Sequence, residues 1–389
     1  MPRPRSALIV ALAGLAVGGA GVFLLAAPDG TGAPTYHGEV SRVMQANCVM
    51  CHRDGGIAPF SLEEYETASA MAPMIEVMVS EGRMPPWFAN PEYGRWANDR
   101  SLTDADRQTL LSWARAGAPE GEPADAPPPA EFVEGWMLGE APDTVIPIPE
   151  VQEIPAEGVV DYRYVYVKTD FPEDRWIQKA ELRPTGNEVA HHSIVFQEAP
   201  DDEERGPWIV GWAPGVPPSV FPEGTGKLLP AGGWLMFQLH YTTMGEPATD
   251  RTELALVFAD ETPERRVRTR AVGTSDFEIP PGADNHEVVA ELEFEEEGEI
   301  LSLLPHMHYQ GKAFRYELIH PNGREEILLD VPAYDFNWQL SYVPEEPIRT
   351  EPGMVLRGRA WYDNSEANPA NPDPTETVTY GEQSFDEMM

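Results

Sequence analysis

The chain has 389 residues, enough for two or three domains, and carries 65 acidic against 27 basic residues, for a formal net charge of −38. The acidic residues are spread along the chain and do not form a single tail. Such a charge makes nucleic acid and anionic lipid surfaces poor partners and indicates a highly solvated surface, of a kind that also suits a salt-adapted protein.

Residues 1–30 have the composition of a targeting segment. Arg3 and Arg5 precede an uncharged apolar run over residues 7–27, which is long for a signal-peptide core and about the length that spans a bilayer. Two alternatives remain open, a cleaved signal peptide and an uncleaved N-terminal membrane anchor. Both predict that the rest of the chain is extracytoplasmic, in the bacterial periplasm, and the second anchors it to the inner membrane.

Cys48-Val49-Met50-Cys51-His52 has the pattern of c-type haem attachment, in which two thiols add to the porphyrin vinyl groups and the neighbouring imidazole binds the iron. The alternatives are a disulfide or redox pair and half of a zinc site. The sequence has no other cysteine to complete a zinc site, and export places the motif where haem is attached. We therefore predict one covalent haem c on Cys48, Cys51 and His52.

Apolar residues at helical spacing surround this motif, so residues 31–120 are predicted to form a small all-α cytochrome c domain. Thr103 and Asp106 resemble a capping box that opens one helix. The sixth iron ligand is expected to be Met84, because the prolines that follow it stiffen a loop that has to hold sulfur over the haem. His37 is the alternative ligand. Three further methionines lie on an apolar helical stripe, where core packing is the expected role: Met71, Met74 and Met78.

Residues 121–150 are rich in proline, alanine and acidic residues and are predicted to be a stiff linker. After Val151 the apolar periodicity changes from helical to alternating, which predicts β-strands. The predicted strands cover residues 161–168, 176–182, 188–196, 235–241, 288–294, 300–304, 314–319 and 354–362. Many short strands without intervening helices indicate two all-β antiparallel sandwich domains, jelly-roll-like, at residues 151–274 and 275–389.

The β-rich half also holds most of the candidate metal ligands. Residues two apart in an extended strand share a face, so His306 and His308 present two imidazoles side by side. The predicted domain boundary gives each domain three candidates: His191, His192 and His240 in the first, and His306, His308 and Met388 in the second, with Met389 as a rival to Met388. Imidazole and thioether ligands together suit copper better than calcium or magnesium.

These residues resemble the ligand motifs of the copper type II, ascorbate-dependent monooxygenases, the family of peptidylglycine α-hydroxylating monooxygenase and dopamine β-monooxygenase. The shared features are the adjacent histidine pair, a later single histidine in Gln238-Leu239-His240-Tyr241, the His-x-His and a terminal Asp-Glu-Met. The resemblance spans about residues 150–389, and a cytochrome c domain ahead of it is similar to bacterial members of the group.

The resemblance implies two mononuclear copper ions on facing sandwich domains. By motif position, His191, His192 and His240 would hold an electron-transfer copper, whereas His306, His308 and Met388 would hold the catalytic copper that binds dioxygen and hydroxylates the substrate. A soft thioether favours Cu(I), the state that has to meet dioxygen. Adjacent residues of a regular strand point to opposite faces, so His191 and His192 can share one metal only at a β-bulge or a strand end. We predict such an irregularity there.

Two features depart from the family pattern. Peptide-hydroxylating relatives have an arginine two positions before the His-x-His that helps to bind the substrate carboxylate, and this chain has Leu304 there, which argues against a C-terminal peptide substrate. Relatives also continue beyond the position of Met388, so either the second domain is cut short or its copper site is completed differently.

Together these features predict an oxidoreductase that hydroxylates an aliphatic C–H bond of a small organic substrate with dioxygen. It would use two copper ions and electrons supplied through the haem from ascorbate or a redox protein. Two other classes of function remain open. A non-catalytic electron carrier or copper-handling protein would keep the ligands without the oxygen chemistry, and an extracytoplasmic haem sensor would bind no copper.

Overall fold

The structure, a computed structural model, describes residues 32–133, 135–202 and 205–389. The predicted signal peptide or membrane anchor at residues 1–30 lies outside the described residues. From Pro34 to Met389 the chain forms one compact unit. Within the described part of the chain, no helix has both the length and the apolar character needed to cross a bilayer.

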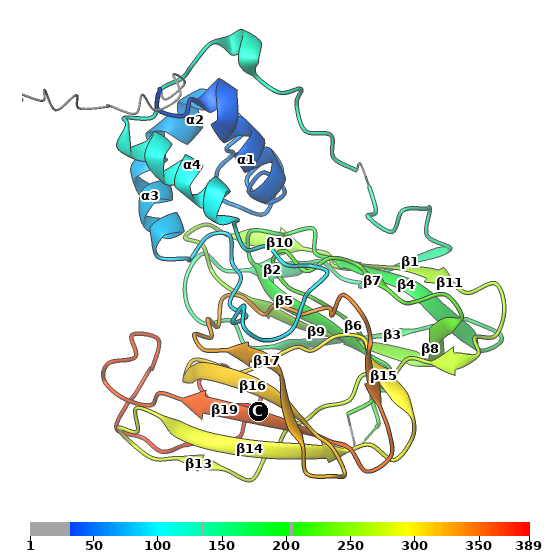
Figure 1. Cartoon of the computed structure of the whole chain (residues 1–389). Helices are drawn as coiled ribbons and strands as arrows, with labels where there is room; N and C mark the ends of the chain where they lie inside the picture. The colour runs from blue at the N-terminus through cyan, green and yellow to red at the C-terminus, as the bar shows by residue number, and fades with distance from the viewer. Residues whose placement is uncertain (1–31, 134, 203–204) are drawn as a thin grey trace, which may run out of the picture. The chain divides into compact units, whose positions relative to one another are not determined.

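The first β region covers residues 144–266 and consists of two large sheets that enclose one apolar core, with one short two-stranded sheet beside them (Figure 1). Its strands are β1 (Thr144–Pro147), β2 (Gln152–Ile154), β3 (Arg163–Lys168), β4 (Arg175–Arg183), β5 (Ala190–Phe196), β6 (Trp208–Trp212), β7 (Ser219–Val220), β8 (Thr225–Leu229), β9 (Trp234–Tyr241), β10 (Ala248–Asp250), β11 (Glu253–Phe258) and β12 (Arg265–Arg266). A six-stranded sheet has the order β1-β11-β4-β8-β12, with β7 beside β4, and a four-stranded sheet has the order β3-β9-β5-β6. Alternating apolar residues such as Ile177 on β4 and Phe237 on β9 point into the shared core.

The second β region covers residues 278–389 and is built differently, around one four-stranded sheet. Its strands are β13 (Glu278–Ile279), β14 (His286–Glu293), β15 (Gly298–Ile300), β16 (Gly311–Ile319), β17 (Glu325–Val331), β18 (Ile348–Thr350), β19 (Val355–Tyr362) and β20 (Val378–Thr379). The sheet has the order β14-β19-β16-β17, and two short pairs, β13-β20 and β15-β18, accompany it. The predicted strand at residues 300–304 is not formed, because β15 ends at Ile300 and only Leu303 makes a further bridge, to Tyr342.

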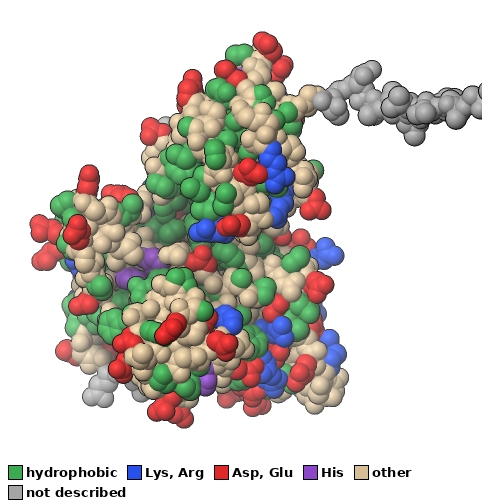
Figure 2. All heavy atoms as spheres, turned by 90° about the vertical axis from the view of Figure 1, so that its left-hand side faces the viewer, with side chains coloured by type: hydrophobic (Ala, Val, Ile, Leu, Met, Phe, Trp, Pro, Cys, Tyr) green, Lys and Arg blue, Asp and Glu red, His purple; other side chains and the backbone are tan. Residues whose placement is uncertain are grey.

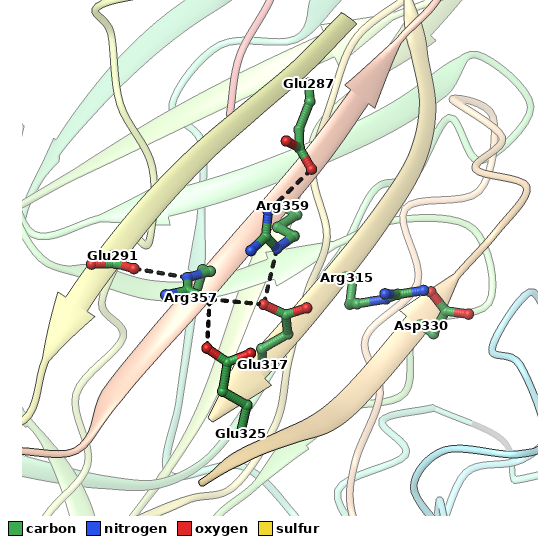
Figure 3. A network of polar contacts seen from close by, with 8 residues as sticks. All are labelled: Glu287, Glu291, Arg315, Glu317, Glu325, Asp330, Arg357 and Arg359. Atoms are coloured by element: carbon green, nitrogen blue, oxygen red, sulfur yellow. Dashed lines mark hydrogen bonds and ion pairs between the residues drawn. The ribbon is translucent and has the colours of Figure 1, made fainter. Parts of the chain in front are cut away.

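Alternating charges cover one face of the sheet β14-β19-β16-β17, where they form cross-strand ion pairs (Figure 3). Glu317 on β16 is the centre of the network: its carboxylate lies 2.9 Å from Arg359 Nε and 3.4 Å from Arg357 Nη1, both on β19. Glu287 and Glu291 on β14 pair with the same two arginines from the other side. Opposite charges on neighbouring strands support the strand register, since a shift by one residue would move them to the other face.

The helices form a small segment before the β regions. The described residues contain four α-helices of 6 to 12 residues: α1 (Ser41–Asn47), α2 (Tyr65–Ala70), α3 (Ala72–Ser80) and α4 (Asp104–Arg115), with a π-helical turn η1 (Tyr36–Val40) and a 3₁₀ turn η2 (Pro123–Asp125). Met44, Leu110 and Trp113 are buried in their common core. The predicted start of α4 is confirmed, because the Thr103 hydroxyl accepts the Asp106 N–H at 3.1 Å.

The predicted fold class, a small all-α cytochrome c domain followed by two jelly-roll-like sandwiches, is wrong: the fold is mostly β, with four short α-helices among the described residues. The physical reason lies in the chain between α3 and α4. Trp87 packs against the apolar core of the second β region, the Asn90 N–H donates to Asp330 O at 2.8 Å, and the Ala97 N–H donates to Val343 O at 2.8 Å. This stretch therefore completes a β core and does not belong to a separate α domain.

Candidate metal centre

A β-bulge brings His191 and His192 to the same site. Strand β5 pairs with β9, and the register shifts between Ala190 and His192, so the two histidines do not alternate as they would in a regular strand. Their Nδ1 atoms lie 3.0 Å apart. The predicted irregularity at this pair is confirmed.

His240 completes a group of three imidazoles in the first β region. It lies on β9 directly opposite His192, and its ring centroid is 4.9 Å from those of both His191 and His192. One nitrogen from each of the three rings lies within 4.8 Å of the others, a spacing that can hold a metal ion. Tyr162 supports the group: its ring stacks on His240 at 4.4 Å, and its hydroxyl lies 3.3 Å from His192 Nε2.

His306 and His308 lie in irregular chain between β15 and β16, with ring centroids 5.2 Å apart. Each ring is oriented through its Nδ1 atom. His306 Nδ1 lies 2.5 Å from Gln339 Oε1, and His308 Nδ1 lies 3.2 Å from Asp386 O. Both contacts place the ring proton on Nδ1 and leave Nε2 free, which is how a hydrogen-bonded second partner fixes the tautomer of a ligand histidine.

The C-terminal segment is tied to this pair through Glu387, which is fully buried. Its carboxylate accepts the backbone N–H of His308, the N–H of Gln310 at 3.1 Å and the N–H of Met388 at 2.8 Å. The backbone of Met388 is thus held next to that of His308, and the Tyr362 hydroxyl fixes it further by donating to Met388 O at 2.7 Å. The side chain of Met389, by contrast, packs against the apolar core of the second β region, which favours Met388 as the proposed ligand.

The two groups of histidines are neighbours in space. The ring centroids of His192 and His306 lie 6.1 Å apart, so five imidazoles from the two β regions form one continuous cluster. Phe336 lies among them: it stacks on His191 at 4.7 Å and contacts the rings of His240 and His308 at 6.5 and 6.4 Å. Figure 2 shows histidine side chains, in purple, at a recess of the surface bordered by apolar side chains.

All five imidazoles are expected to be neutral at pH 7. Burial, reinforced by the neighbouring imidazoles, lowers the pKa of His191 to about 4 and that of His240 to about 3, and it lowers the pKa of His192 well below its ordinary value. Burial likewise lowers the pKa of His308 to about 3 and lowers that of His306. Neutral imidazoles keep a lone pair for a metal, so this electrostatic state suits metal binding and disfavours a second proton on any ring.

Unpaired ring nitrogens also fit a metal. Among the described residues, three buried imidazole nitrogens have no hydrogen-bond partner: His191 Nε2, His240 Nδ1 and His308 Nε2. A buried polar atom without a partner costs about 1–3 kcal/mol, and a metal–ligand bond would remove that cost. The residues present therefore fit transition-metal ions that prefer imidazole.

The proposed haem ligands lie in the helical segment. Cys48 follows α1, and the turn through Cys51 and His52 folds back on it, since the N–H groups of Cys51 and His52 donate to Cys48 O at 3.1 and 2.9 Å. The two thiols are not joined by a disulfide. His52 Nδ1 lies 3.2 Å from Phe60 O, which leaves Nε2 free to bind iron. Met84 lies apart from these residues in the sequence, in the loop after α3, where its N–H donates to Met78 O at 3.2 Å.

Sequence reasoning missed three residues that contact the imidazoles: Tyr162, Phe336 and Gln339. An aromatic or amide residue in a loop has no periodicity or spacing that relates it to a distant histidine. The Asp386-Glu387 pair was the exception, because it stands directly before the predicted ligand Met388.

No known family profile matches the chain, and no curated protein matches it. Among solved structures, that of allantoicase is similar over 56% of this chain and 81% of that chain, with 12% identity and a TM-score of 0.17. A likeness this weak carries no argument about fold or function.

Proposed function

We propose that this protein is a copper-dependent monooxygenase that hydroxylates an aliphatic C–H bond of a small organic substrate with dioxygen and receives its electrons through a covalently bound haem c. The proposal rests on one observation above all: five imidazoles from two β regions lie in a continuous cluster, with His192 and His306 only 6.1 Å apart between ring centroids. The likeness of the ligand motifs to the copper type II, ascorbate-dependent monooxygenases supports the same reading.

Two groups of residues would each hold one copper ion. His191, His192 and His240 would form the first group, and His306, His308 and Met388 would form the second, with a thioether in place of one imidazole. Copper bound at both sites would store the two electrons that a monooxygenase reaction needs and would activate dioxygen at the second site.

The surrounding residues orient the ligands and limit access of water. Gln339 and Asp386 hold the Nδ1 protons of His306 and His308, and Glu387 holds the backbone of the segment that carries Met388. Phe336 covers one face of His191. A reactive metal site requires ligands that are held in place by hydrogen bonds and shielded from water, because both limit side reactions.

The haem would be attached through Cys48 and Cys51, with His52 as one axial ligand and Met84 as the proposed second. The Phe60 carbonyl orients the His52 ring. When bound, the haem supplies single electrons, and an external donor such as ascorbate or a redox protein would reduce it. Export by the N-terminal segment would place this chemistry in the periplasm, where covalent haem attachment occurs, with or without an anchor in the inner membrane.

Copper content and substrate-coupled dioxygen uptake test the proposal together. We expect two copper ions per chain and dioxygen uptake that requires both a reductant and an oxidisable substrate.

His306→Ala should abolish product formation and leave the haem absorbance unchanged. His286→Ala is the matched control, because His286 lies at the start of β14 and is not part of the histidine cluster. A protein that binds two copper ions but shows no uptake with any substrate would be an electron carrier or copper-handling protein; one that binds no copper would contradict the proposal outright.

A further inference from the structure

The loop that carries Met84 continues directly into the core of the second β region. Pro85 and Pro86 follow Met84 and fix the backbone, and Trp87 then packs on Tyr342, with ring centroids 4.8 Å apart. Tyr342 is 2% exposed, so this aromatic contact lies inside the protein. A residue proposed to bind iron is therefore three positions from an indole that touches the β core.

Tyr342 is connected to His306 by two short routes. Its backbone exchanges two hydrogen bonds with Leu303, at 2.8 and 2.9 Å, and Leu303 is three residues before His306. Tyr342 is also three residues after Gln339, whose Oε1 lies 2.5 Å from His306 Nδ1. Leu303 and Gln339 are both buried, so each route runs through packed protein without a solvent gap.

We propose that Trp87 and Tyr342 form the electron route from the haem to the site of His306, His308 and Met388, without passage through the other three histidines. The inference rests on the function proposed above and adds the residues that connect the haem to the copper site. With both groups bound, the haem would give up one electron, and the copper held by His306, His308 and Met388 would accept it. Neither Trp87 nor Tyr342 is a proposed metal ligand; the two residues would connect the segment that carries Met84 to the segments that carry His306 and Gln339.

A second connection leads from the helical segment to the first β region and is the competing route. Arg100 Nη2 donates to Gly215 O, and Gly215 follows β6, the strand that pairs with β5. This connection runs through one arginine side chain and then through backbone, whereas the route through Trp87 uses two aromatic rings in contact. The aromatic contact favours the His306 site.

The test uses the full chain loaded with haem and copper and fully oxidised, without dioxygen or substrate. A light flash in the presence of a photosensitiser delivers one electron to the haem, and the decay of ferrous haem absorbance is followed together with the Cu(II) electron paramagnetic resonance signal. We expect a decay that does not depend on protein concentration. Trp87→Leu should slow it several-fold, Trp87→Phe should retain most of it, and Trp136→Leu, in a separate small apolar cluster, should leave it unchanged.

Removal of each copper site identifies the electron acceptor. His240→Ala, which disables the first group, should leave the Trp87-dependent decay in place, and His306→Ala should abolish it. A wild-type rate in Trp87→Leu, or loss of the decay in His240→Ala, would overturn the route.

The haem and copper content of the same preparations distinguishes failure of the proposed function from failure of the route. A wild-type chain that lacks haem or copper refutes both. A chain with full haem and copper content and a normal decay rate in Trp87→Leu refutes the route alone. The long-wavelength absorption of a methionine-ligated ferric haem checks that the Trp87 variants keep Met84 in place.

Discussion

The buried carboxylate of Glu387 accepts the backbone N–H of His308, a residue 79 positions earlier in the chain. The same carboxylate oxygen accepts the N–H of Met388, so one side chain joins two of the three proposed ligands of the second copper site. A buried acceptor shared by several N–H groups is costly to remove, because each donor left without a partner is also left without water.

Replacement of Glu387 by glutamine is expected to weaken both the fold and the second copper site. The amide retains one acceptor oxygen but presents N–H₂ to a backbone donor, so roughly 1–3 kcal/mol of stability should be lost. Urea unfolding and copper content of the purified variant are the measurements. Glu382→Gln is the matched control: Glu382 pairs with Tyr164 and Arg205 near the surface, where the loss should stay below about 1 kcal/mol. Equal stability and equal copper content in the two variants would contradict the role of Glu387.

His240→Ala is expected to remove one copper ion per chain and to leave the other bound. His240 is one of three imidazoles whose nitrogens lie within 4.8 Å, and two remaining imidazoles bind a copper ion much more weakly than three. Copper analysis after gel filtration measures the stoichiometry, with His286→Ala as control. Retention of two copper ions in His240→Ala would show that this histidine is not a ligand.

Phe336→Ala is expected to open the cluster to small molecules. The ring stacks on His191 at 4.7 Å and contacts His240 and His308, so its loss exposes imidazoles of both groups. An external chelator should extract copper faster from this variant than from the wild type. The stability loss should fall below the ~3–5 kcal/mol typical of a fully buried phenylalanine, because Phe336 is only half-buried. Phe171→Ala, which removes a half-buried ring in contact with Phe258, is the control and should leave copper extraction unchanged.

Lys227 is expected to make the free energy of unfolding increase with pH above neutral pH. Its buried ammonium donates to Trp208 O, Ile209 O and Thr269 Oγ1 at 2.7–3.0 Å, and burial lowers its pKa to about 7. Above that pH the folded state has released the proton, while the unfolded state keeps it up to the ordinary lysine pKa. The unfolded state therefore binds more protons, and stability rises with pH by at most ~1.4 kcal/mol per unit.

Lys227→Met should abolish this rise, and Lys168→Met, at an exposed lysine, should not. Urea unfolding of the wild type and both variants at several pH values from neutral to mildly alkaline provides the comparison. The same slope in all three proteins would show that Lys227 stays protonated in the folded state.

Cys48→Ala is expected to prevent stable covalent haem attachment and to leave the copper sites intact. The thiol lies at the end of α1 beside the helical core, and the histidine clusters are formed entirely by β regions. Haem staining of the denatured chain and copper analysis test the two parts separately. Substrate oxidation with an artificial reductant should persist; loss of copper binding in this variant would show that the copper sites depend on the Cys48 thiol.

The sequence by itself determined the local structure wherever a short-range pattern carries the information. Alternating apolar residues predicted β3, β4, β9 and β19, and the Thr103 cap predicted the start of α4. The bulge in β5 was predicted from the adjacent histidines together with the family resemblance, which implies that both hold one metal ion. The strand and cap predictions depend on residues within a few positions of one another, which backbone geometry relates.

Only the tertiary structure decided which residues meet. No local sequence pattern shows that Trp87 packs against Tyr342 in the core of the second β region. This is why the predicted independent α domain was wrong. The contacts of Phe336 with His191 and of Gln339 with His306 are equally invisible in the sequence. An aromatic or amide side chain is compatible with many partners, and the choice among them is made when the two β regions pack, because burial and hydrogen-bond satisfaction are properties of the whole fold.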